Sequence, residues 1–94
     1  MSVESILKER QKTHGEFSTH AKISQDLKLI LRDNDGELSD VQKEALDMIL
    51  HKVARILNGN PNHKDHWDDI AGYATLAAKQ LLFSIKFDAV PKAA

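Results

Sequence analysis

Cysteine is absent from this 94-residue chain, and glycine, proline and aromatic residues are scarce. The lack of cysteine excludes disulfides, Cys-ligated zinc, iron–sulfur clusters and a thiol nucleophile. Only four glycines and two prolines are present, so few positions force a turn. With 41% hydrophobic and 29% charged residues, the composition is typical of a globular protein, and we expect a single domain over residues 1–94.

An excess of charge of one sign and long apolar runs are also missing. Thirteen Lys and Arg residues against fourteen Asp and Glu residues leave a formal net charge of -1. A DNA or RNA polymer attracts proteins with excess positive charge, so we expect no nucleic-acid polymer as a partner. No run approaches the roughly 18 apolar residues of a membrane span, and the N-terminus lacks the layout of a signal peptide. These absences predict a cytoplasmic protein with no membrane partner.

Three breaks divide the chain into four segments, and each segment has the apolar spacing of a helix rather than of a strand. The breaks lie at Gly15, at Asn34 to Gly36 and at Asn58 to Asn62. We predict an all-α protomer of three to four helices, with a mobile tail over about residues 88–94. The expected helices run from Val3 to about Lys12, from Ser18 to about Arg32, from Ser39 to Leu57, and from His66 to about Phe87.

Polar residues next to these breaks predict how the helices begin. Ser18 can cap the second helix, and Ser39 with Gln42 resembles a capping box at the start of the third. Asn62 or Asp65 can cap the fourth helix. A buried stripe is expected on the second helix at Ile23, Leu27, Ile30 and Leu31, and another on the third at Leu46, Ile49, Leu50, Val53, Ile56 and Leu57.

The fourth helix has too many apolar residues for one core. Past Thr75 they surround most of its circumference, at Leu76, Leu81, Leu82, Phe83, Ile85 and Phe87. We therefore predict a homo-oligomer built around this helix. Earlier in the same helix, Trp67 is expected in the core and Gly72 at a close helix contact.

Polar residues of the third and fourth segments could carry chemistry. Glu44, Asp47, His51 and Arg55 share one side of the third helix, where a solvated face is the ordinary interpretation and Arg55 is the best functional candidate. Asp65, Asp68 and Asp69 could bind a divalent cation together with Glu44 and Asp47, or could simply complement the helix dipole. His63 and His66 lack an obvious third ligand, so we expect no metal site.

The break between the first two helices is the other candidate site. Two flat rings, His14 and Phe17, flank Gly15, and a purine could stack on them. Positive charge for phosphates is available nearby at Arg10, Lys12, Lys22 and Lys28. The alternative is a plain corner between two helices in which Phe17 packs as a hydrophobic staple. The residues alone leave both interpretations open.

Several of these segments resemble a known family. HGEF, AKISQDLK and VQKEALDMILHKVARILNGNPNHKDHWDDIAGYATLA resemble a group of small helical bacteriophage proteins from about Lys8 to Leu81, and HWDDIAGYA is the most specific stretch. The group is similar to the anti-CBASS proteins, which act as sponges for the cyclic-nucleotide messengers of bacterial antiphage immunity.

The resemblance implies an all-helical protomer that interlocks into a homohexamer in the cytoplasm of the infected bacterium. It implies binding of cyclic dinucleotides between protomers and of cyclic trinucleotides at separate sites, without cleavage, cofactor, metal or catalytic residue. His14 matches the family's stacking aromatic residue, where tyrosine is usual, and Lys28 matches its ligand-binding lysine. The expected ligand-binding residues are Arg10, His14, Gly15, Phe17, Lys28, Arg55, Asp69 and Tyr73.

Two alternatives belong to other functional classes. The carboxylates of the third and fourth helices loosely resemble the magnesium ligands of all-helical nucleotide pyrophosphohydrolases of the MazG and dimeric dUTPase type, although the glutamate-rich first motif of those enzymes is missing. A structural or interaction protein of the phage is the other alternative. Magnesium-dependent turnover would indicate the enzyme, and failure to bind nucleotides would indicate the interaction protein.

Overall fold

The chain forms four helices and no strand over the part that the computed structural model describes, which is residues 2–88 for the backbone and residues 2–82 for the side chains. The all-α prediction is therefore confirmed. The helices are α1 (Val3–His14), α2 (Phe17–Asp33), α3 (Asp40–Asn58) and α4 (Lys64–Asp88). None of the described helices is both long enough and apolar enough to cross a membrane.

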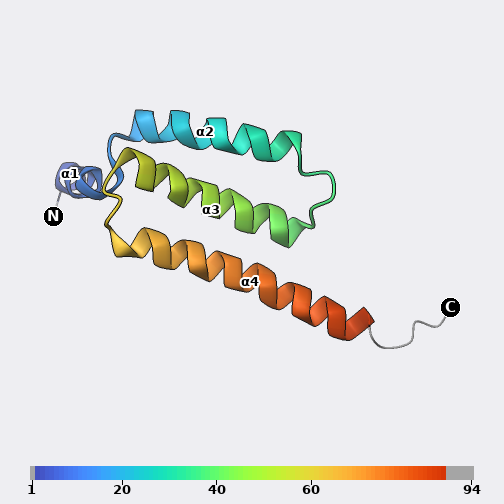
Figure 1. Ribbon diagram of the computed structural model, residues 1–94. Coiled ribbons are helices and arrows are strands. Elements are labelled where there is room, and N and C mark those ends of the chain that lie inside the picture. The colour runs from blue at the N-terminus through green and yellow to red at the C-terminus, as the bar shows by residue number, and fades with distance from the viewer. Residues whose placement is uncertain (1, 89–94) are drawn as a thin grey trace.

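Helix α3 lies between α2 and α4, and these three helices form an open layer (Figure 1). In the described residues α2 and α4 do not contact each other, whereas each of them packs along α3. Helix α1 crosses the end of the layer, where α2 begins and α3 ends (Figure 1). It makes only a few contacts with α2 and α3 and, through its last two residues, with His66 of α4, so α1 extends outward from the layer.

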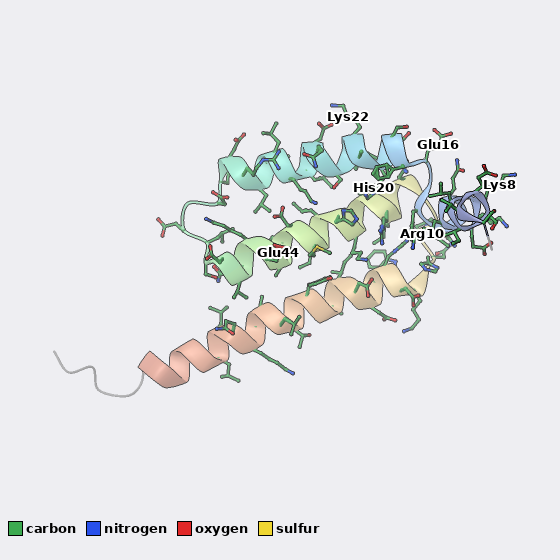
Figure 2. The ribbon with its side chains drawn as sticks, turned by 180° about the vertical axis from the view of Figure 1, so that it is seen from behind. Lys8, Arg10, Glu16, His20, Lys22 and Glu44 are labelled. Carbon is green, nitrogen blue, oxygen red and sulfur yellow. The ribbon has the colours of Figure 1, made fainter. Side chains whose placement is uncertain are left out.

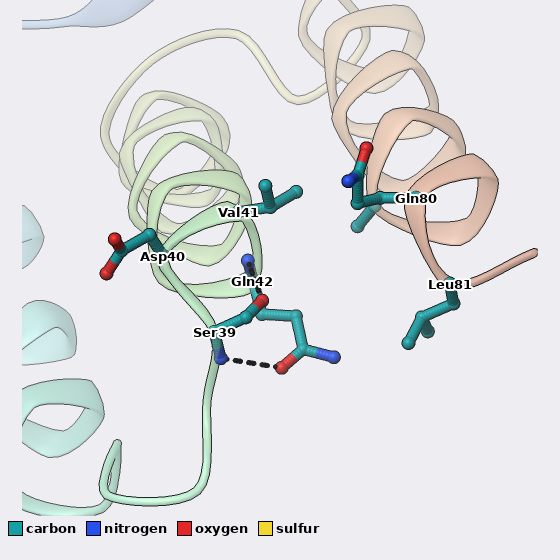
Figure 3. A pocket seen from close by; sticks show the side chains of 7 residues that line it. Ser39, Asp40, Val41, Gln42, Gln80 and Leu81 are labelled. Carbon is teal, nitrogen blue, oxygen red and sulfur yellow. Dashed lines mark hydrogen bonds between the residues drawn. The ribbon is translucent and has the colours of Figure 1, made fainter. Parts of the chain in front are cut away.

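The starts of the helices confirm one predicted cap and correct others. Ser39 and Gln42 form a capping box, in which the Ser39 N–H donates to Gln42 Oε1 at 3.0 Å and the Gln42 N–H donates to Ser39 Oγ at 3.1 Å (Figure 3). Ser18 is not a cap, because α2 begins one residue earlier with Glu16 at the capping position. Helix α4 begins at Lys64, so Asp65 lies inside its first turn and Asn62 lies two residues before it, and neither is at the capping position.

The remaining helix ends differ from the prediction by a few residues. Helix α1 continues to His14, where Gly15 ends it, and α4 begins at Lys64, two residues before the predicted start. Helix α4 also includes Asp88. The rest of the predicted mobile tail, residues 89–94, lies outside the described residues.

The open layer buries little apolar surface. Among the described side chains the only buried hydrophobic residues are Ala45 and Ala54, both on the central helix α3. Two expected core positions are wrong, because Ile30 and Leu57 are each 65% exposed. A single layer of helices covers α3 on two sides and leaves both faces of the layer open, so the other residues of the two expected stripes are only half-buried.

Two expectations for α4 are also wrong. Trp67 is 54% exposed instead of lying in the core, and its indole N–H donates to the Pro61 carbonyl at 2.8 Å. Gly72 does not mark a close helix contact, since a Cβ atom there would meet open space. Leu76, Leu81 and Leu82 are exposed, as the apolar excess predicts, while the side chains of Phe83, Ile85 and Phe87 lie outside the described residues.

Candidate functional site

The turn between α1 and α2 docks on the end of α3 through a glycine. Gly15 has a φ of 77°, a left-handed conformation that favours glycine. A Cβ atom at this position would also clash with the carbonyl group of Asn58. Asn58 closes the contact because its side-chain amide donates to the carbonyls of His14 at 3.0 Å and Glu16 at 2.8 Å. One asparagine therefore holds both sides of the turn.

A second glycine makes the reciprocal contact from the loop between α3 and α4. A Cβ atom at Gly59 would clash with the backbone of Thr13 and His14, so the two chain segments meet backbone to backbone. The next residue, Asn60, donates its N–H to the Thr13 carbonyl at 2.9 Å. We call this junction of residues 13–16 with residues 58–60 the corner. The sequence marked both segments as breaks, but nothing in it paired them.

Three of the five histidines of the chain gather at the corner. The ring centroid of His66 lies 4.9 Å from that of His14 and 4.7 Å from that of His63. His66 is only 2% exposed, and its Nε2 lies 3.3 Å from His14 Nδ1. The histidine cluster thus fixes the His14 ring against the first turn of α4.

The other two histidines form a pair between α2 and α3. The rings of His20 and His51 meet edge to face, with centroids 4.6 Å apart and an interplanar angle of 80°. His20 is 6% exposed, and its Nδ1 is buried without a hydrogen-bond partner. Sequence reasoning missed His20 altogether and placed His51 on a solvated stripe. That interpretation is wrong because α2 packs against this side of α3, which leaves both His51 and Arg55 half-buried.

Burial and the charge of Arg55 both lower the pKa of four of the histidines. Burial and the Arg55 charge lower the pKa of His14 to about 4, and the same two causes lower the pKa of His51 to about 4. Burial also lowers the pKa of His66, and burial with the Arg55 charge lowers that of His20. The imidazoles of His14, His20, His51 and His66 are therefore neutral near pH 7 beside a guanidinium that stays charged.

A groove of about 500 Å³ opens in front of these residues. It is bordered by the end of α1, the corner, the start of α2 and the last turns of α3, and its lining consists of Leu7, Arg10, Gln11, His14, Gly15, Glu16, Phe17, Ser18, His20, His51 and Arg55. Figure 2 shows Arg10, Glu16 and His20 at this end of the molecule, while Glu44 lies toward the opposite end of α3.

The charge of the groove is mainly positive. Burial and the Arg10 guanidinium lower the pKa of Arg55, which indicates two cations close together. Within the described part of the chain neither arginine forms an ion pair. Glu16 is the only acidic residue of the lining, and its side chain is exposed. Two guanidinium groups without carboxylate partners favour an anionic ligand such as a phosphate.

The groove contains five of the eight predicted ligand-binding residues: Arg10, His14, Gly15, Phe17 and Arg55. Phe17 is 76% exposed, so it does not pack as a hydrophobic staple. The other three do not line the groove. Lys28 lies on α2 close enough to lower the pKa of His20 and His51, Asp69 pairs with Lys52 Nζ at 2.9 Å, and Tyr73 is half-buried on α4.

The carboxylates of the alternative magnesium site are dispersed. Asp68 pairs with Lys64 at 2.7 Å and Asp65 approaches His63 Nε2 at 3.7 Å, while Glu44 is exposed far from both. In the portion of the chain with described side chains, no three His, Asp or Glu residues are placed to hold a metal ion. The His14, His63 and His66 cluster is no exception.

A second, smaller hollow lies at the opposite end of the layer. It has a volume of about 220 Å³ and lies between the start of α3 and α4 (Figure 3). Its lining is Ser39, Asp40, Val41, Gln42, Ala77, Gln80 and Leu81, which includes none of the predicted ligand-binding residues and only one ionisable group. The larger groove is therefore the candidate functional site.

Comparison with known proteins places the chain in one family. No curated protein and no solved structure matches it. Residues 2–81, which include α1 to α3, most of α4 and every residue of the groove, match the family described as a domain of unknown function, DUF6378. The chain belongs to this family.

Proposed function

We propose that the protein binds and sequesters cyclic oligonucleotide messengers without cleaving them, and so antagonises CBASS immunity in the cytoplasm of an infected bacterium. Cyclic dinucleotides are the first ligand class, and cyclic trinucleotides the second. The proposal starts from the resemblance of the HGEF and HWDDIAGYA segments to the anti-CBASS sponges. The observation that carries it is the groove, in which flat rings and unpaired guanidinium groups lie together.

The lining suits the two chemical parts of a nucleotide. The His14 ring packs against the His66 ring, and Phe17, on the other side of Gly15 in the sequence, has an exposed ring. Both His14 and Phe17 line the groove, so a base could stack on either ring. Arg10 and Arg55 offer N–H donors in the planar geometry that phosphate oxygens accept. The volume of about 500 Å³ falls within the roughly 300–1,000 Å³ of small-molecule sites.

The chemistry of the groove supports binding rather than turnover. Metal-assisted hydrolysis of a phosphodiester needs carboxylates that converge on a cation. The described carboxylates are instead dispersed or paired with lysines, so nothing in the geometry favours the pyrophosphohydrolase alternative.

The exposed apolar surface supports assembly into a homo-oligomer, with a hexamer implied by the resemblance. Only two alanines form the buried apolar core of the described residues, whereas Leu7, Phe17, Leu76, Leu81 and Leu82 are all about half exposed or more. Further copies of the chain would bury such surface and would close a groove that one protomer leaves open.

Calorimetry with the full chain and three probes tests the proposal: cyclic GMP–AMP, cyclic di-GMP and cyclic tri-AMP. We expect at least one to bind and to be recovered intact by chromatography after protein digestion. Arg55→Gln should weaken binding about tenfold or more, because a charge-assisted phosphate contact contributes about 1.5–3 kcal/mol. His14→Ala should also weaken binding, by loss of stacking.

Matched controls separate the groove from general charge. Lys22→Ala removes a cation from the outer side of α2, where Lys22 pairs with Asp26, and should leave affinity unchanged (Figure 2). Magnesium-dependent appearance of monophosphates would show an enzyme instead of a sponge. Absence of binding by all three probes would contradict the proposal and favour an interaction protein.

A further inference from the structure

The floor of the groove contains a histidine pair to which neither the sequence patterns nor the resemblance gave a role. His20 comes from α2 and His51 from α3, and both line the groove behind the corner. His20 is only 6% exposed, yet its Nδ1 has no hydrogen-bond partner. A buried polar atom without a partner costs about 1–3 kcal/mol, so a ligand group that reached His20 Nδ1 would gain a hydrogen bond there.

The charged residues that act on His51 from α2 and α3 are positive. Helix α2 contributes Lys28, and α3 itself contributes Lys52 and Arg55. From α1, Arg10 faces Arg55 across the groove, and α4 contributes Asp69, which is bound to Lys52. Further acidic groups are Asp47, one turn earlier on α3, and Glu16 in the lining of the groove.

We propose that His51 is a proton-dependent ligand contact, which takes up a proton when an anionic phosphate enters the groove beside Arg55 and thereby makes binding tighter at lower pH. The inference rests on the proposed function, because it assumes that a phosphate-bearing ligand occupies this groove. The inference makes His51 a specificity-determining residue, because its protonation favours anionic ligands.

The sign follows from the charges. In the free protein, burial and the Arg55 charge keep the pKa of His51 at about 4, so the ring is neutral near pH 7. A phosphate anion in the groove offsets the Arg55 charge and favours the imidazolium, which raises the pKa of His51 in the complex. Binding then takes up protons between the two pKa values, and affinity rises as pH falls through the pKa of the complex.

Protonation also changes what the pair can donate. An imidazolium has two N–H donors, whereas the neutral ring has one. The added donor can bind a phosphate oxygen of the ligand, while the neighbouring His20 ring stands edge to face against His51 with its centroid 4.6 Å away. His20 thereby acts as a positioning residue that holds the His51 ring toward the groove.

The test measures proton uptake on binding of whichever of the three cyclic nucleotide probes binds. Calorimetry at about pH 8 and about pH 5.5, in buffers of different ionisation enthalpy, should show uptake that grows at the lower pH, with affinity tighter by about threefold or more. His51→Gln keeps a hydrogen-bonding side chain but does not titrate, so it should remove most of the proton uptake and most of the pH dependence of affinity.

His63→Gln is the matched control, because His63 belongs to the other histidine group and does not line the groove. It should retain the full pH dependence. In the wild-type protein, NMR titration of the His51 ring signals should show a higher pKa with ligand than without, a readout that does not depend on a folded variant.

The possible failures are distinct. Binding without proton uptake, or with uptake that His51→Gln leaves undiminished, would overturn this inference and leave the proposed function standing. Failure of the wild-type protein to bind any of the probes at either pH would overturn the proposed function and, with it, the role of His51.

Discussion

The two ends of the helical layer are held together differently. At the corner, hydrogen bonds join residues far apart in sequence: Asn58 to His14 and Glu16, Asn60 to Thr13, and His66 to His14. At the opposite end, the described side-chain hydrogen bonds are local, such as Ser39 with Gln42 and Asn34 with Ile30. The difference shows that the long-range polar contacts of the protomer are concentrated where the groove is formed.

Backbone approach distinguishes the two ends as well. Gly15 and Gly59 bring two segments into contact so close that neither position has space for a Cβ atom, whereas a Cβ atom at Gly36, in the loop between α2 and α3, would meet nothing. With so small an apolar core, the geometry of the groove depends on this polar junction more than on side-chain packing. Three predictions would break or sharpen the comparison.

The largest effect is expected for Gly15→Ala. The substitution imposes a left-handed φ on alanine and a clash with the Asn58 carbonyl, so we expect the free energy of unfolding to fall by about 3 kcal/mol or more. Gly72→Ala is the control, since it fills open space in a helix and should stabilise the protein by about 0.5–1 kcal/mol. Urea unfolding of both variants measures the effects. Equal stabilities would show that the corner is not a rigid junction.

An intermediate effect is expected from acidification, because all the histidines lie at or beside the corner. The pKa values of His14 and His51 are about 4 in the folded protein, below the ordinary value of 6.5, so the unfolded chain binds protons first as pH falls. Protonation of these two histidines therefore does not reduce the free energy of unfolding above about pH 6.5, and it reduces this free energy progressively as pH falls from there toward about pH 4.

Unfolding measured in urea at about pH 7.5 and about pH 5.5 should therefore show a loss of about 1–2 kcal/mol, after allowance for solvent screening. The double variant His14→Gln with His51→Gln should flatten this dependence. A wild-type protein whose stability rises on acidification would contradict the electrostatic account of the corner.

The smallest effect is expected at the opposite end. Ser39→Ala removes one half of the capping box and should cost about 1 kcal/mol, because one helix start loses its side-chain acceptor. Ser18→Ala is the matched control: Ser18 was a predicted cap but lies inside α2, so its loss should change stability by less than about 0.5 kcal/mol. Thermal unfolding followed by helix content compares the two. A larger loss of stability for Ser18→Ala than for Ser39→Ala would indicate that Ser18 caps α2, as the sequence predicted.

The sequence by itself determined what local physical chemistry controls. Helix propensity and apolar spacing act over one or two turns, so four helices, the break at Gly15 and the capping box at Ser39 could be read directly. The candidate site was also partly visible, because His14, Gly15 and Phe17 are adjacent in sequence and Arg10 lies one turn before them.

Only the tertiary structure decided which breaks meet and which faces are covered. Asn58 and Gly59 read as a helix end, and their contact with residues 13–16 joins positions more than forty residues apart. His20 and His51 became the floor of the groove because α2 packs on the polar side of α3. Amphipathic spacing shows that a helix has two faces, but the arrangement of neighbouring helices determines what each face contacts, and here an open layer left apolar residues exposed and placed imidazoles inside.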